Sequence, residues 1–576
     1  MPDDTLPAAG SKQAQGDASK GPLHPVRFVT AAALFDGHDA AINIMRRILQ
    51  AQGAEVIHLG HNRSVDEVVT AAIQEDAHGI AVSSYQGGHV EYFKYMIDLL
   101  RERGRPDIAV FGGGGGVIVA DEVRDLEAYG VTRVYSPEDG RRLGLQGMIA
   151  DMIQTARRDL SADLPKDLGG LKAGDAAELA RIITAIEDGR LPKPLLEELN
   201  AIAQSRDTVP VLGITGTGGA GKSSLTDEIV RRFRFGSGEP RIAVVAIDPT
   251  RRKTGGALLG DRIRMNANNA ANVFFRSLAT RDAKTEVPPP LADIIAAVKA
   301  AGADIVIIET PGIGQGDAGI VPFCDVSLYV MTPEFGAASQ LEKIDMLDFA
   351  DVIVINKMDR KGAMDALRDV RKQVQRNREA FGAKPDDMPV FGAIASRFND
   401  AGVTAVYQEL LIQFTAKGFP ALPHLLPTVA VRTSEPGQAI VPPDRQRYLA
   451  EIADEVRGYL ARAEAQARIA RARQQALETA RMLEETGKNI SDVRDLADSK
   501  SKELSAEAHA LLDAWPETSA AYSSDEMVVT VRDREIRNGL TRTTLSGNTV
   551  RRVSLPKYED HGELLKWLMR ENLPGY

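Results

Sequence analysis

Residues 216–223 read Gly216-Thr217-Gly218-Gly219-Ala220-Gly221-Lys222-Ser223 and indicate the fold more strongly than any other segment of the chain. An apolar run at 209–214 precedes them, and residues 224–230 continue as a predicted helix. A strand, a glycine-rich turn and a helix in this order form a phosphate-binding loop, because the glycines let backbone N–H groups converge on phosphate oxygens. The alternative is a glycine-rich turn without a ligand. The predicted nucleotide contacts of this loop are Gly216, Gly218, Gly219, Ala220, Gly221, Lys222, Ser223 and Ser224.

A second motif, Asn356-Lys357-Met358-Asp359, follows the predicted strand at 351–355. It therefore lies where loops leave the carboxyl ends of the strands. A carboxylate accepts both N–H donors on one edge of guanine, and adenine does not offer that pair, so Asp359 favours GTP over ATP. Asn356 and Lys357 are expected to contact the nucleotide beside it. Ser396, after the next strand, is either a further contact to the base or an ordinary helix cap.

Acidic residues follow the strands between these two motifs. Asp248 ends the strand at 242–247, Glu309 ends the strand at 305–308, and Asp261 lies in Gly260-Asp261-Arg262. Each alone could cap a helix, but carboxylates beside a γ-phosphate hold Mg²⁺ or its waters. The predicted magnesium ligands are Ser223, Asp248, Asp261 and Glu309, and the predicted catalytic residues are Lys222, Asp261, Arg262 and Glu309.

The chain before residue 157 shows a second candidate site. Strands at 27–32, 55–59, 79–83 and 108–111 alternate with helices, which predicts a parallel sheet covered on both faces. The first, third and fourth strands are followed by Asp36-Gly37-His38-Asp39, Ser83-Ser84-Tyr85 and Gly112 to Gly116, respectively. These three segments meet at one sheet edge, where open α/β sheets bind ligands. The alternative for His38 is a solvent-facing side chain on a capped helix.

Composition narrows the class of protein. The 576 residues suggest three or four domains, and the net charge of −10 argues against nucleic acid as a main partner. No apolar run approaches the roughly 20 residues that span a bilayer. Residues 1–24 lack the apolar core of a signal peptide and are expected to be a disordered leader. Cys324 is the only cysteine, which excludes an internal disulfide and a cysteine-based zinc site and favours the cytoplasm.

The acidic segments also resemble a known family. Asp248-Pro249-Thr250, Thr254-Gly255-Gly256, the run at 259–265 and the run at 309–315 are similar to the switch segments of the GTPase chaperones of methylmalonyl-CoA mutase. Gln340 and Lys343 resemble the additional switch of that family. The resemblance covers about 179–420 and implies a GTPase that gates cofactor delivery to a cobalamin mutase.

The front segments resemble the cobalamin-binding domain of the methylmalonyl-CoA mutase and methionine synthase group. The pattern of that group is Asp-x-His-x-x-Gly, then Ser-x-Leu, then Gly-Gly; Ala41 and Tyr85 replace its first Gly and its Leu. The resemblance implies that His38 replaces the dimethylbenzimidazole of the cofactor on cobalt and that Asp36 fixes the tautomer of the ring. It also implies that Ser83, Gly115 and Gly116 line the cleft for the displaced nucleotide tail, which Ala41 slightly narrows.

The order of the two parts resembles the fused isobutyryl-CoA mutases, and the runs at 531–536, 555–558 and 571–576 look like their entry into the mutase domain. This resemblance implies 5'-deoxyadenosylcobalamin, radical interconversion of isobutyryl-CoA and n-butyryl-CoA, a homodimer, and an adenosyltransferase that delivers the cofactor. The acyl-CoA would bind a barrel of roughly 250 residues, so we expect a fragment that hydrolyses GTP without mutase turnover. Two alternatives stay open: a chaperone that serves a mutase in trans, and a sensor of cobalamin or light.

The predicted fold class is α/β for both domains that carry the candidate sites. The expected parts are a flavodoxin-like cobalamin-binding domain at 25–157, a linker at 158–178, a P-loop GTPase domain at 179–425, a mostly helical linker at 426–545 and the start of a mutase domain at 546–576. Within the helical linker, Leu449, Ile452, Val456 and Leu460 define one apolar helical face, and Gly487 is the expected stop.

Overall fold

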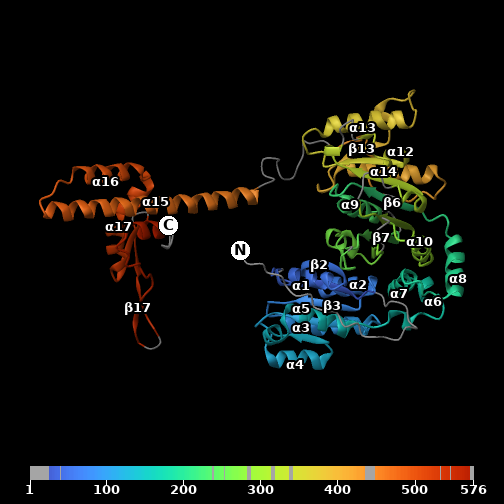
Figure 1. Ribbon diagram of the computed structural model, residues 1–576, viewed down its shortest axis with the longest axis horizontal. Coiled ribbons are helices and arrows are strands. Elements are labelled where there is room, and N and C mark those ends of the chain that lie inside the picture. Colours follow the sequence, from blue (N-terminus) through green and yellow to red (C-terminus); the bar gives the residue numbers. More distant parts are fainter. Residues whose placement is uncertain are drawn as a thin grey trace, which may run out of the picture. The chain divides into compact units, whose positions relative to one another are not determined.

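The chain forms two compact units in a computed structural model, Met1–Gln438 and Ala439–Tyr576 (Figure 1). The structure describes residues 25–38, 40–235, 239–251, 253–281, 287–312, 318–335, 341–423, 425–434, 448–531, 534–544 and 547–570. The expected leader, Asp39, the switch residues 313–315, Gln340 and the tail at 571–576 lie outside these ranges. Within them, no helix has the length and the apolar character needed to cross a membrane.

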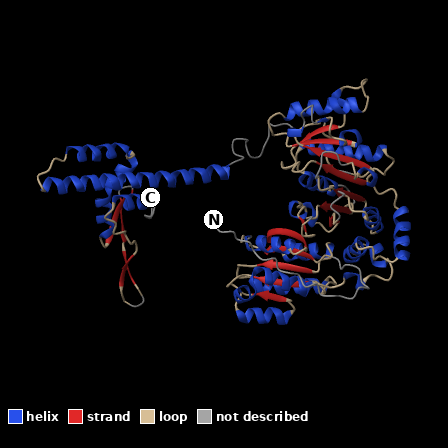
Figure 2. Ribbon diagram, viewed as in Figure 1, coloured by secondary structure: helices blue, strands red, loops and turns tan. Residues whose placement is uncertain are grey.

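The first sheet has the strand order β5-β4-β3-β1-β2-β8, and all neighbouring strands are parallel. Its strands are β1 (Arg27–Ala33), β2 (Glu55–Arg63), β3 (Gly79–Ser83), β4 (Ala109–Gly113), β5 (Arg133–Tyr135) and β8 (Ala257–Leu259). Its helices are α1 (Ala40–Ala51), α2 (Val65–Gln74), α3 (His89–Glu102), α4 (Ala120–Tyr129) and α5 (Pro137–Ala156), which lie on both faces (Figure 2). The chain order reverses between β1 and β3, which opens a ligand crevice at their carboxyl ends.

The second sheet has the order β13-β12-β11-β6-β10-β7-β9 and is also parallel. Its strands are β6 (Val211–Gly216), β7 (Ile242–Asp248), β9 (Val273–Ala279), β10 (Ile305–Glu309), β11 (Val326–Met331), β12 (Val352–Asn356) and β13 (Val390–Ala393). Its helices are α9 (Lys222–Arg234), α10 (Leu291–Ala300), α12 (Met346–Phe349), α13 (Ala363–Asn377) and α14 (Ala401–Ala416). The strands are almost continuously apolar because both faces of a parallel sheet are covered.

Short helices connect the two sheets. They are α6 (Gly169–Ala173), α7 (Ala176–Glu187) and α8 (Lys193–Gln204), after a 3₁₀ turn at Leu160–Asp163. The apolar side of α7 packs with α10 and with strands of the second sheet in one buried cluster. The predicted linker at 158–178 contains the 3₁₀ turn and α6.

The strand β8 was not predicted. Residues 257–259 belong in sequence to the second domain, yet they pair with β2 and extend the first sheet by one strand. Ala257 and Leu259 are fully buried in the apolar core of the first sheet. The two α/β domains thus share a sheet edge.

The described residues of the second unit form a long helix, three shorter helices and two hairpins. Its elements are α15 (Tyr448–Glu485), α16 (Ser491–Glu503), α17 (Ala506–Ser523), β14 (Glu526–Val531), β15 (Arg534–Gly539), β16 (Thr541–Thr543), β17 (Thr549–Arg551) and α18 (His561–Leu568). The small buried cluster between α15, α17 and α18 is centred on Ala463, Ala470, Ala508 and Leu565. Gly487 has a left-handed backbone just after α15, as the predicted stop requires. The predicted apolar face of Leu449, Ile452, Val456 and Leu460 is exposed in this unit.

Candidate functional site

The glycine-rich loop connects the central strand β6 to α9, the strand-loop-helix context that the sequence predicted. The turn uses left-handed backbone at Gly219 and Gly221, and α9 begins at Lys222. The Lys222 side chain is buried, and its Nζ donates to the carbonyl oxygens of Gly216 at 3.1 Å and Thr217 at 3.3 Å. The amine therefore lies against the glycine-rich loop at the N-terminus of α9. The backbone N–H groups at a helix N-terminus favour a bound anion.

Ser223 lies between two of the predicted carboxylates. Its Oγ is 2.8 Å from Glu309 Oε1 and 3.1 Å from Asp261 Oδ1, and its hydroxyl hydrogen donates to one of them at a time. Asp248 Oδ2 accepts a hydrogen bond from the N–H of Gly260 at 3.0 Å, which fixes the loop that carries Asp261. All four predicted magnesium ligands thus belong to one group at the carboxyl edge of the sheet.

This group of acids is electrostatically unfavourable on its own. Burial, with the repulsion of Asp261 added, raises the pKa of Glu309 to about 7. Burial, together with the charges of Asp261 and Glu309, raises the pKa of Asp248 well above its usual value. Glu309 Oε2 is buried without a hydrogen-bond partner among the described residues. A cation at this place would relieve both the repulsion and the unsatisfied oxygen.

The carboxylates do not form a complete metal cage. Within the described ranges, no three His, Cys, Asp or Glu side chains are arranged to hold an ion by themselves. Mg²⁺ usually takes one or two carboxylates and completes its shell with waters and phosphate oxygens. The residues present therefore fit Mg²⁺ that binds together with a nucleotide, and fit a permanent metal site poorly.

Arg262 departs from its predicted catalytic role. Its guanidinium is buried, and it donates to Gln74 Oε1 at 2.7 Å, to Glu75 Oε1 at 3.3 Å and to the carbonyl oxygen of Phe275 at 3.1 Å. Residues 262–264 form a 3₁₀ turn, so the side chains of neighbouring residues diverge. Asp261 turns toward Ser223, and Arg262 turns toward α2 of the first domain.

The base-recognition motif reaches the same edge. The Asn356 amide donates to the carbonyl oxygen of Ala220 at 2.8 Å, and its Oδ1 accepts from the N–H of Ala395 at 3.0 Å. Asn356 thereby joins the phosphate loop to the loop after β13. Lys357 Nζ donates to the carbonyl oxygen of Gly219 at 2.6 Å, whereas Asp359 is exposed at the rim. Ser396, directly after Ala395, is exposed at the same rim.

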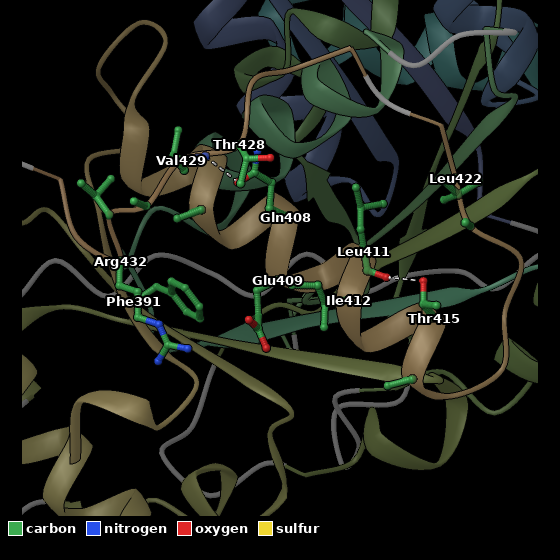
Figure 3. A pocket seen from close by; sticks show the side chains of 15 residues that line it. Phe391, Gln408, Glu409, Leu411, Ile412, Thr415, Leu422, Thr428, Val429 and Arg432 are labelled. Carbon is green, nitrogen blue, oxygen red and sulfur yellow. Dashed lines mark hydrogen bonds between the residues drawn. The ribbon is translucent and has the colours of Figure 1, made fainter. Parts of the chain in front are cut away.

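A separate cavity of about 780 Å³ lies between α14 and residues 421–422 and 428–432 (Figure 3). Gln408 accepts a hydrogen bond from the N–H of Val429 across one end of it. Its lining contains none of the predicted site residues, so the nucleotide site is not this cavity.

In the first domain, Asp36 organises the loop after β1. Its Oδ1 accepts from the backbone N–H of His38 and is 2.9 Å from His38 Nδ1, and its Oδ2 accepts from the N–H of Tyr85 at 2.6 Å. Burial opposes the charge of Asp36, but these hydrogen bonds outweigh it and hold its pKa below the usual value. Because a carboxylate only accepts, Nδ1 of His38 carries the proton in this contact, and Nε2 carries the free lone pair. The His38 side chain is 76% exposed.

A cleft of about 250 Å³ is lined by Tyr85, whose ring lies near His38. Its walls come from α1, α5 and the carboxyl ends of β3 and β4, and they are largely apolar. Ser83 and Gly115 line it, as predicted, whereas Gly116 is not among the lining residues. The Ser83 hydroxyl is buried there without a hydrogen-bond partner among the described residues, so a polar group of a ligand would satisfy it. The Tyr85 ring packs near His38, with centroids 5.6 Å apart.

Family comparisons match the two parts of the chain that carry the candidate sites. A family described as Methylmalonyl Co-A mutase-associated GTPase MeaB matches residues 179–489, more than half of the chain. The chain belongs to this GTPase family. A B12 binding domain matches residues 26–138.

Curated relatives match this MeaB-family chain over nearly its whole length. The fused isobutyryl-CoA mutase of Cupriavidus metallidurans is 62% identical over 557 residues, which is 96% of this chain and 51% of that protein. Those of Nocardia farcinica and Geobacillus kaustophilus are 59% and 53% identical, over 96% of this chain and 51% and 52% of their own lengths. The chain therefore spans about half the length of the curated relatives it matches.

Gly114 also lines the cleft, and the sequence analysis did not single it out. A Cβ at this residue would lie 1.9 Å from the carbonyl oxygen of Ser84, so only glycine lets the loops after β3 and β4 approach one another. The run Gly112 to Gly116 identifies the loop but not its most crowded member, because the crowding comes from a strand some thirty residues away in sequence.

We expect Gly114→Ala to weaken cobalamin binding by at least about tenfold, because the added methyl pushes the two cleft walls apart. Ultraviolet-visible titration with cobalamin measures the change. Gly87→Ala is the matched control, since nothing lies within 4 Å of a Cβ there. An affinity of Gly114→Ala equal to that of the control would contradict this account of the cleft.

Proposed function

We propose that this chain hydrolyses GTP with Mg²⁺ and binds adenosylcobalamin, and that in the whole protein these parts serve an acyl-CoA mutase that interconverts isobutyryl-CoA and n-butyryl-CoA. The observation that carries the proposal is the coexistence, in one compact unit, of the Ser223 group of acids and the Asp36–His38 pair, each at the carboxyl edge of its own sheet. The mutase half rests on the relatives alone, because this chain spans about half of their length.

In the GTPase part, each residue has a distinct task. Lys222 neutralises phosphate charge, and backbone N–H groups of residues 218–223 bind phosphate oxygens. Ser223, Asp248, Asp261 and Glu309 would hold Mg²⁺, which supplies further neutralisation of the charge that develops at the phosphates. Asp359 selects guanine, with Lys357 and Ser396 beside it at the rim.

In the first domain, the residues orient a cofactor. Asp36 fixes the tautomer and the direction of the His38 ring, so that Nε2 would ligate cobalt when cobalamin is bound. Ser83 offers its hydroxyl to the displaced tail, and the apolar walls of the cleft exclude water. Bound adenosylcobalamin would supply the radical chemistry, and the protein supplies position.

The cobalt ligand is tested by electron paramagnetic resonance. Cob(II)alamin bound to protein that contains ¹⁵N-histidine should show the hyperfine splitting of a ¹⁵N nucleus, because an imidazole nitrogen replaces the benzimidazole. Splitting identical to that of unlabelled protein would mean that the cofactor keeps its own base. His61→Asn, on the outer end of β2, is the control variant that should leave the signal unchanged.

The partners are inferred from the relatives. We propose an acyl-CoA substrate, a homodimer, and an adenosyltransferase that delivers the cofactor to a cytoplasmic protein. The second candidate function is a GTPase chaperone that serves a mutase in trans. Assay of the chain with adenosylcobalamin, GTP, Mg²⁺ and isobutyryl-CoA, with and without an added mutase barrel, separates the two.

A further inference from the structure

The segment between Asp248 and Asp261 leaves the GTPase domain and lies on the cobalamin-binding domain. Its middle residues are β8, which pairs with β2 in parallel register: Glu55 with Ala257, Val56 with Leu258, and Ile57 with Leu259. Strand addition of this kind fixes a segment through main-chain hydrogen bonds along its length. Two predicted magnesium ligands therefore stand at the two ends of a segment that belongs structurally to the other domain.

The start of β8 is held by close backbone contact. A Cβ on Gly256 would lie 2.2 Å from the carbonyl oxygen of Gln50, in the last turn of α1. It would lie 2.9 Å from the carbonyl oxygen of Ala54, directly before β2. The N–H of Ala257 donates to the Ala54 carbonyl oxygen at 3.2 Å. Only glycine at 256 lets the strand come this near.

The end of the segment is held by Arg262. Its hydrogen bonds to Gln74 and Glu75 lie at the carboxyl end of α2, and its third bond, to the carbonyl oxygen of Phe275, lies on β9. Ile263 packs against Gly60 of β2, where a Cβ would meet the Ile263 side chain at 2.9 Å. Asp261 is thus fixed between β8 and an arginine anchored in the first domain.

We infer that Arg262 is a positioning residue for the GTPase magnesium site: by anchoring the segment after β8 on α2 of the cobalamin-binding domain, it places the Asp261 carboxylate beside Ser223. Arg262 touches neither Ser223 nor Glu309 in the described structure, so its effect acts through the backbone of Asp261. This inference rests on the proposed function, because it needs Mg²⁺ to bind with the nucleotide at Asp261.

The test measures Mg²⁺-dependent nucleotide binding. The fluorescence of a mant-labelled, non-hydrolysable GTP analogue is followed while Mg²⁺ is titrated, and again in excess EDTA. Arg262→Ala should raise the half-saturating Mg²⁺ concentration about tenfold, the usual size for the loss of a residue that orients a metal ligand. Its affinity in EDTA should match the wild type, because the phosphate loop is untouched. Arg262→Lys should bring the half-saturating Mg²⁺ concentration part of the way back to the wild-type value. A lysine ammonium can still donate to an acceptor on α2, but it lacks the planar guanidinium that makes several hydrogen bonds at once.

Arg181→Ala is the matched control. Arg181, on α7, is also a buried arginine at the domain boundary, where it bonds to Asp76, the neighbour of Glu75. It makes no hydrogen bond or ion pair with the described residues of the segment at 249–262. Arg181→Ala should lower the melting temperature and keep the wild-type half-saturating Mg²⁺ concentration. A general loosening of the domain boundary would instead shift both arginine variants alike and would overturn the positioning role.

Gly256→Ala provides an independent variant should Arg262→Ala fail to fold. It removes no hydrogen-bonding side chain, and it should raise the half-saturating Mg²⁺ concentration in the same direction as Arg262→Ala. Gly382→Ala, at a residue with nothing within 4 Å of a Cβ, should behave as wild type. Wild-type Mg²⁺ dependence in both Arg262→Ala and Gly256→Ala would overturn the inference. If the wild-type chain itself bound the analogue without any Mg²⁺ dependence, the proposed GTPase site would fail instead.

Discussion

Lys222→Ala should lower the rate of GTP hydrolysis by about a hundredfold to a thousandfold, the size expected when one electrostatic contact to a transferring group is lost. The structure gives the reason. The amine of Lys222 is buried at the loop and is held by the Gly216 and Thr217 carbonyl oxygens, so it lies where phosphate oxygens converge. Alanine leaves the carboxylates Asp261 and Glu309 without the nearby positive charge that offsets them.

Release of inorganic phosphate at saturating Mg²⁺ and GTP measures this loss. Lys372→Ala, on the exposed side of α13 in the same domain, is the matched control and should hydrolyse GTP at the wild-type rate. Far-ultraviolet circular dichroism should be the same for both variants, since neither changes an apolar core residue. A Lys222→Ala protein as active as the Lys372→Ala protein would show that hydrolysis occurs at another site.

The phosphate loop and the base-recognition motif were predictable because each is a local pattern that follows its own strand. Gly216 to Ser223 needs only the preceding strand and the following helix, and both have the predicted types. The pattern could not show that Asn356 would brace Ala220 and Ala395, since that contact joins three loops far apart in sequence. The local motifs predicted the sheet edge at which these loops lie, but they did not predict the contacts that each side chain makes there.

Arg262 shows why the remainder was not predictable. Beside Asp261 in the sequence, it has the charge of a phosphate-binding residue, and its partners Gln74 and Glu75 lie nearly 190 residues earlier. Similarly, residues 257–259 are too few to stand out as a strand, and they become one only because the outer edge of β2 is available to pair. Non-local pairing decides both features, and a single sequence carries no signal for it.

In the cobalamin-binding domain, the contact of Asp36 with His38 was predictable from their residue types and spacing, whereas their role toward cobalt stays a prediction. Only a carboxylate and an imidazole two residues apart give the Asp36–His38 pair, and the structure brings them together. The second oxygen of Asp36, by contrast, takes its hydrogen bond from the backbone of Tyr85, and a backbone donor leaves no trace in residue identity. The substitution of Tyr for the family's Leu therefore leaves this contact intact.

Asp359→Asn should exchange the base preference of the site, lowering the affinity for GTP by at least about a hundredfold and favouring xanthosine triphosphate. The Asp359 carboxylate accepts both N–H donors of guanine, whereas the asparagine amide presents one acceptor and one donor. Xanthine has a carbonyl acceptor where guanine has an amino donor, so it matches the amide. A site built on paired hydrogen bonds rejects a ligand that lacks one partner by about 10⁴-fold or more. The expected loss of GTP affinity is therefore larger than for most substitutions at the rim.

Isothermal titration with Mg²⁺ and non-hydrolysable analogues of both nucleotides measures the exchange. Asp365→Asn, an exposed residue on α13 whose partner is Arg368, is the matched control and should keep the GTP preference of the wild type. The phosphate loop is the same in both variants, so the affinity for inorganic triphosphate should not differ between them, and any difference in GTP affinity reports the base alone. Because Asp359 is exposed and its neighbour Lys357 is tied to Gly219, removal of one charge should leave the loop in place. An Asp359→Asn protein that prefers GTP as strongly as Asp365→Asn would place guanine recognition on other residues.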